Sequence, residues 1–167
     1  MLKKIAIASL CLLLPVLALA KGEGYGKTTW GMTPQQVISA EASRANLIEP
    51  QKYTGNMWGK AQINTVTIGS SQYTVNFLFD ESDQLVQTNV TSQEKNNAGI
   101  AELNFENLNQ LLTQKYGNPL FKGKDSVTWK TPDTTIELSK LIIPRVVAQV
   151  NIRYIPHSRV KSDTSNL

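Results

Sequence analysis

The chain has little of the chemistry that metal and catalytic sites use. Its 167 residues contain one cysteine, Cys11, and one histidine, His157. A zinc site takes three or four cysteine, histidine or acidic ligands, and a serine–histidine–aspartate triad needs its imidazole held rigidly between two partners. Since His157 lies in a polar C-terminal stretch, we expect no metal, no cofactor and no catalytic residue, and the chain is predicted not to be an enzyme.

Acidic residues offer little more. The tight cluster 80–83 lacks the alternating ligands and the glycine of a calcium loop, so it is interpreted as a hairpin turn. A pair of carboxylates distant in sequence, as glycosidases use, stays open because any of the 13 acidic residues could meet in space. No glycine-rich phosphate loop follows a predicted strand.

The N-terminus has the three parts of an export signal. Two lysines precede an uncharged run over residues 5–14, and the small residues of 18–20 suit signal peptidase, which predicts cleavage between Ala20 and Lys21. The apolar run is too short to span the ~30 Å hydrocarbon core of a bilayer. The mature chain is therefore expected to have no transmembrane segment.

Cleavage would remove Cys11 and lower the net charge from +4 to +2, because Lys3 and Lys4 leave with the signal. An exported domain without disulfides favours the periplasm of a Gram-negative bacterium over the eukaryotic secretory route. The small charge indicates no nucleic-acid partner. A lipidated Cys11 is the alternative, and Leu10 argues against it because that position takes a small residue.

Two helices and six strands are predicted. Thr33, Pro34 and Gln36 form a capping box that starts a helix reaching to about residue 45, and apolar residues at helical spacing predict a second helix over 103–116, ended by Gly117. The strands follow the helices in two sets: 63–68, 73–79 and 85–91, then 126–130, 134–138 and 146–154.

Short connections between these strands indicate an antiparallel sheet, whose apolar face both helices must cover. The predicted fold is α+β, with two helix-plus-three-strand units. We divide the chain into a signal peptide (1–20), a flexible leader (21–29), one domain (30–155) and a mobile tail (156–167).

Candidate binding residues lie in a predicted loop over 49–60. Tyr53, Met57 and Trp58 are large side chains in a loop that contains Gly55 and Gly59, and such side chains are natural anchors for a partner. The alternative is that Trp58 folds back onto the sheet and completes the core. The run 141–143 is either an exposed apolar lip or part of a buried strand.

One motif carries a family resemblance. Gly31-Met32-Thr33 followed by Gln36-Val37 resembles the Gly-Met-Thr-x-x-Gln-Val opening of the SmpA/OmlA (BamE-like) domain of outer-membrane assembly lipoproteins, and the β-lactamase-inhibitor-protein fold looks like two such modules in tandem. The resemblance implies an exported, non-catalytic protein that binds another protein through a sheet face or a loop rim. Trp30-Gly31-Met32 with Lys115-Tyr116-Gly117 and Pro119 is also similar to an uncharacterised bacterial periplasmic protein family.

These observations predict a periplasmic protein that acts by protein–protein interaction, either as an envelope accessory factor or as an inhibitor or immunity protein. Its partner would be another envelope or exported protein. The alternative is a small-ligand or cell-wall binding module that uses the sheet face, and a concave pocket lined by Trp58 and Tyr73 would favour it.

Overall fold

The computed structural model describes residues 22–42 and 44–160. The predicted signal peptide, with the cleavage site at Ala20 and Lys21, lies outside the described residues, as does the tail beyond residue 160. Within the described part of the chain, no helix is both long and apolar enough to cross a membrane.

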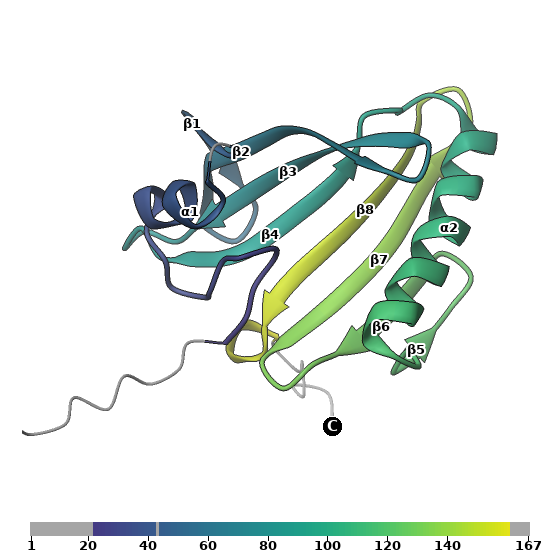
Figure 1. Ribbon diagram of the computed structural model, residues 1–167. Helices are drawn as coiled ribbons and strands as arrows, with labels where there is room; N and C mark the ends of the chain where they lie inside the picture. The colour runs from purple at the N-terminus through teal and green to yellow at the C-terminus, as the bar shows by residue number, and fades with distance from the viewer. Residues whose placement is uncertain (1–21, 43, 161–167) are drawn as a thin grey trace, which may run out of the picture.

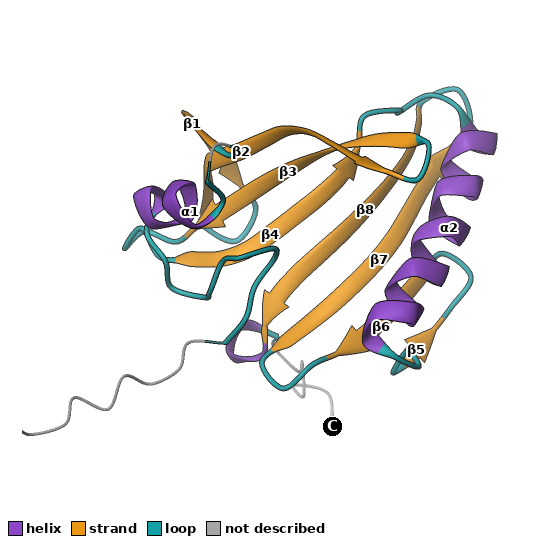
Figure 2. Cartoon of the chain, in the orientation of Figure 1, coloured by secondary structure: helices purple, strands orange, loops and turns teal. Residues whose placement is uncertain are grey.

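Strands dominate the fold (Figure 2). The described residues form one eight-stranded antiparallel sheet with the order β1-β2-β3-β4-β8-β7-β6-β5. Its strands are β1 (Asn46–Tyr53), β2 (Met57–Ile68), β3 (Ser71–Phe79), β4 (Leu85–Ser92), β5 (Phe121–Lys122), β6 (Ser126–Lys130), β7 (Thr134–Ile143) and β8 (Val147–Pro156).

The predicted α+β arrangement of two helix-plus-three-strand units is wrong. Among the described residues each helix is followed by four strands, and all eight belong to a single, largely β structure. The prediction missed β1 and β5, the two edge strands. Strand β1 is exposed along most of its length and β5 has two residues, so neither carries the apolar alternation that marks a half-buried strand.

Helix α1 (Pro34–Ala40) begins where the sequence predicts. The Gln36 amide donates to Thr33 Oγ1, and the Thr33 amide donates to Gln36 Oε1 at 2.9 Å, so the capping box is confirmed. The helix is shorter than predicted and ends before Glu41. Helix α2 (Ala98–Tyr116) starts earlier than predicted, because Asn97 caps it by accepting from the Ile100 amide.

Both helices pack on one face of the sheet (Figure 1). A single core cluster joins Val37 of α1 and Phe105 of α2 to alternate residues of the strands, among them Phe77 and Ile152. We call the opposite face the helix-free face, since no helix of the described residues packs there.

Residues 22–29 belong to the predicted leader. They form a strap over the sheet, closed by a β-bridge between Glu23 and Thr29. The Trp30 indole donates to Thr134 Oγ1 at 2.8 Å, and Thr134 Oγ1 donates to the Glu23 carbonyl at 2.6 Å. The three glycines of the strap let its backbone approach neighbouring side chains closely.

The start of the predicted mobile tail is also structured. His157–Arg159 forms a single 3-10 turn, the His157 amide donates to the Asp133 carbonyl, and Arg159 donates to Asp80 at 3.1 Å.

Candidate functional site

Polar side chains cover the middle of the helix-free face. Because cross-strand partners lie on the same face of a sheet, the strand register aligns them into rows. One row crosses six strands and consists of Gln62, Asn76, Asn89, Arg153, Glu137 and Thr128. The next row contains Thr74, Thr91, Asn151, Ser139 and Ser126.

Hydrogen bonds along these rows fix the side chains. Gln62 donates to Asn76 at 2.6 Å, and Thr91 donates to Asn151 at 2.8 Å. Arg153 forms an ion pair with Glu137. Amide groups have more donors and acceptors than one such bond uses, so the rows present an ordered set of groups that a partner can bind.

Tyr53 and Met57 lie at one corner of this face. They are directly opposite each other in the β1–β2 ladder. The Tyr53 ring lies against Gly59, where a Cβ atom would be 2.9 Å from Tyr53 Cε2 and 3.5 Å from Leu78 Cδ2. Burial of this ring raises the pKa of the Tyr53 hydroxyl. This corner of the face therefore presents the aromatic ring of Tyr53 together with its hydroxyl group.

Trp58 points to the opposite face. Its cross-strand partners are Lys52 and Phe79, and Phe79 belongs to the core. Trp58 is half-buried, with Lys52 Nζ 6.0 Å from its ring centroid. The structure thus brings Tyr53 and Met57 together and separates Trp58 from them.

The predicted loop over 49–60 is a hairpin. Gly55 and Asn56 have φ values of 72° and 54° and reverse the chain between β1 and β2. Glycine and asparagine are the residues that adopt this left-handed conformation most easily. Consecutive side chains of the new strand then alternate between faces, which explains why the three candidate residues do not share one surface.

The helix-free face is hollowed beside Tyr53. The hollow has a volume of about 520 Å³, and its lining includes Gln51, Tyr53, Gln62, Asn76, Thr91 and Gln149. The pocket lined by Trp58 and Tyr73, which would favour a small ligand, does not form among the described residues. Tyr73 is 1% exposed within the core, and burial raises the pKa of its hydroxyl to about 12.

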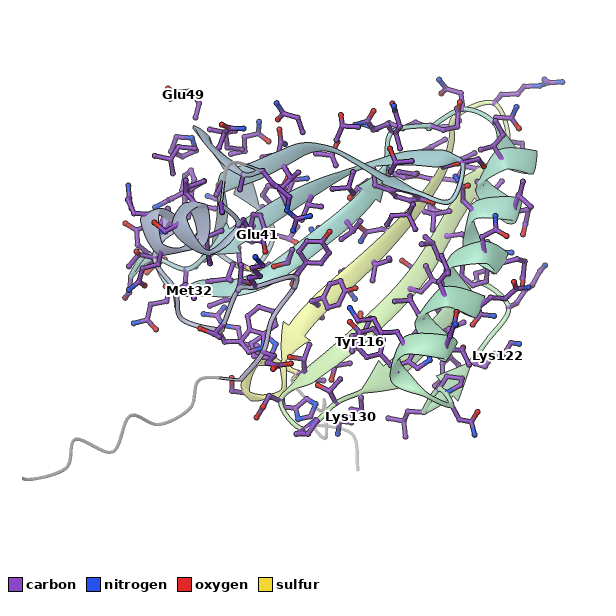
Figure 3. The ribbon with its side chains drawn as sticks, viewed as in Figure 1. Met32, Glu41, Glu49, Tyr116, Lys122 and Lys130 are labelled. Atoms are coloured by element: carbon purple, nitrogen blue, oxygen red, sulfur yellow. The ribbon has the colours of Figure 1, made fainter. Side chains whose placement is uncertain are left out.

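A second cleft lies on the helix side, between the strap, the end of α2 and the β6–β7 turn. Its volume is about 620 Å³, and it is lined by Tyr116, Tyr154, Glu23 and Asp133 among others. Figure 3 shows Tyr116 at the end of α2. Burial and the neighbouring Tyr116 raise the pKa of Tyr154 well above its usual range, so the Tyr154 phenol stays a neutral donor and acceptor.

The carboxylates of this cleft, Glu23 and Asp133, are exposed. Glu41 is the buried carboxylate nearby, and Arg44 and the Lys27 amide bind it. In the described parts of the chain, no group of three or more histidine, cysteine or acidic side chains is placed to hold a metal ion.

Comparisons with known proteins identify no relative of this chain. No family model matches the chain, and neither curated proteins nor solved structures give a significant match.

Proposed function

We propose that the protein is an exported, non-catalytic binding protein that recognises another envelope or exported protein through the helix-free face. The observation that carries this proposal is the breadth of that face. Eight strands about 4.8 Å apart give a surface about 35 Å wide, whose polar side chains are ordered by their neighbours. A role as an envelope accessory factor or as an inhibitor or immunity protein fits this surface.

The shape of the face favours a protein over a small molecule. Small-molecule sites are concave and mostly apolar, whereas the hollow beside Tyr53 is lined mainly by amides and hydroxyls. A typical protein–protein interface covers about 800 Å² on each partner, which a face of this breadth provides. Tyr53, Met57 and Arg153 belong to residue types that are enriched in such interfaces.

A cell-wall or polar-ligand module is the second candidate. The amide and hydroxyl rows around Asn76, Thr91 and Asn151 favour it, because these groups both donate to and accept from hydroxyl-rich ligands.

Site-specific cross-linking tests the proposed surface. With a photoreactive amino acid in place of Thr91, we expect a discrete protein adduct in intact cells, since this residue lies at the centre of the face. The matched control is Gln110, an exposed residue of α2, where no adduct is expected. Adducts at Gln110 but not at Thr91 would contradict the proposal, and attachment of position 91 to cell-wall material alone would favour the second candidate.

Export can be tested separately by intact-mass analysis. The proposal expects a periplasmic chain that begins at Lys21. Cleavage there leaves Lys21 ahead of the first described residue, Gly22, so it would leave the described fold complete. A chain that keeps residues 1–20, or that carries a lipid on Cys11, would contradict the export step without bearing on the binding face.

A further inference from the structure

The hairpin that joins β7 and β8 extends past the paired parts of β6 and β4, and the loop after β4 reaches its base, where the Ala148 amide donates to the Lys95 carbonyl at 2.6 Å. The β7–β8 ladder continues to Ile143 and Val147, but β6 pairs with β7 only as far as Ser139, and β4 pairs with β8 only as far as Asn151. We call residues 141–147 the hairpin tip. Figure 1 shows this connection at one end of the sheet, beside the start of α2.

The hairpin tip is aliphatic and exposed. Leu141 is 54%, Ile143 is 45% and Val146 is 70% exposed, while Ile142 packs on the core from the other face and anchors the tip. Over residues 141–152 the sequence contains one charged residue, Arg145. Exposed apolar side chains gathered at one place in this way mark a site of contact with another protein or a membrane.

Arg145 occupies a position that favours glycine. Its φ is 65°, and the Val146 amide donates to the Ile143 carbonyl at 3.0 Å to close the turn after Pro144. Turns of this shape take glycine or asparagine at the left-handed residue. Arg145 adopts this conformation although it is unfavourable for a residue other than glycine. Its position at the end of an apolar hairpin points to a role for its charge outside the fold.

We propose that the hairpin tip docks on an anionic lipid surface, with its aliphatic side chains in the outer acyl region and Arg145 among the headgroup phosphates. Protein interfaces place their energy in tryptophan, tyrosine and arginine, and leucine and valine are under-represented there. The tip has no aromatic residue, and acyl chains accept aliphatic side chains from any direction. The long stem of an arginine lets its guanidinium reach the phosphates.

The geometry of the tip suits shallow insertion. The three β7 residues of the tip, at about 3.3 Å per residue, reach about 10 Å, which is the depth of interfacial membrane anchors. The ladder pairs the two strands with each other up to the turn, and this internal pairing lowers the cost of bringing backbone amides close to the acyl chains. Leu141 and Ile143 lie on the helix-free face, since Leu141 is paired with Gln149 of the hollow. The inference uses the hairpin tip alone, and its test with lipid needs no partner protein.

Vesicle co-sedimentation of the purified protein tests the inference. We expect binding to vesicles that contain phosphatidylglycerol, weaker binding to pure phosphatidylcholine, and a loss of at least tenfold in partitioning for the double variant Leu141→Ser/Val146→Ser. Arg145→Gly should keep or raise the melting temperature, because glycine suits the turn, and yet bind anionic vesicles several-fold less. Leu47→Ser is the matched control, since Leu47 is 53% exposed on β1, and it should bind like the unaltered protein.

Three results would overturn the inference: no binding of the unaltered protein to anionic vesicles, equal binding of the double variant, or equal binding to both kinds of vesicle. Sedimentation equilibrium without lipid can give a fourth result that would overturn the inference. If the double variant converts a dimer to a monomer, the tip contacts a second copy of the chain instead of lipid.

Discussion

Replacing Trp129 with alanine is expected to lower the free energy of unfolding by about 3–5 kcal/mol, as removal of a fully buried aromatic side chain does. Trp129 is 0% exposed and is the largest fully buried side chain of the described residues. Its indole donates to the Gly117 carbonyl at 3.1 Å, which ties β6 to the end of α2. The substitution therefore leaves a cavity and an unpaired carbonyl at the same place.

Urea denaturation followed by circular dichroism measures this loss. Trp129→Phe keeps most of the apolar volume and loses the hydrogen bond, so it should cost less than the alanine variant. Trp58→Ala is the matched control, because Trp58 is half-buried at the sheet edge and should cost less than half as much. A Trp129→Ala variant within 1 kcal/mol of the unaltered protein would show that Trp129 does not support the core.

Arg44→Ala is expected to cost about 2–4 kcal/mol, because it leaves a buried carboxylate without its cation. The Glu41 side chain is 0% exposed and forms an ion pair with Arg44, whose own side chain is 52% exposed. Glu41 also accepts from the Lys27 amide at 2.8 Å. This carboxylate, labelled in Figure 3, thus joins the end of α1 to the strap.

A double-mutant cycle separates the charge from the packing. Glu41→Gln/Arg44→Ala should recover part of the loss, since a neutral amide needs no cation and still accepts from the Lys27 amide. Arg153→Ala is the control, because the Arg153–Glu137 pair is 47% and 28% exposed and exposed pairs contribute about 0–1 kcal/mol. Equal costs for Arg44→Ala and Arg153→Ala, from thermal or urea unfolding, would contradict a special role for the buried carboxylate.

The parts of the fold that could be predicted are those with local signals. The capping box at Thr33 and Gln36 places the start of α1, because its hydrogen bonds lie within four residues. Residues 73–79 and 146–154 alternate between apolar and polar side chains, and they cover most of β3 and most of β8. The elements that were missed lack such signals. Strand β1 carries Pro50 and is exposed on both sides. Helix α2 begins with the exposed residues 98–100, and its buried face starts only at Ala101.

The candidate site was predictable in residue type but not in arrangement. Tyr53, Met57 and Trp58 were predicted to lie in one loop, and the pleat of β2 places Trp58 on the face opposite Met57. The polar rows of the helix-free face combine residues from strands far apart in the sequence, such as Asn89 and Arg153. No short-range pattern contains that pairing.

The scarcity of cysteine and histidine, the capping box and the alternation of the half-buried strands follow directly from the amino-acid sequence. These properties depend on single residues or on neighbours within one element. Only the tertiary structure decided that eight strands share one sheet, that both helices cover the same face, and that Tyr53 and Trp58 lie on opposite sides. The physical reason is strand register: a shift of one residue moves every side chain to the other face, and long-range pairing such as that of β4 with β8 sets that register.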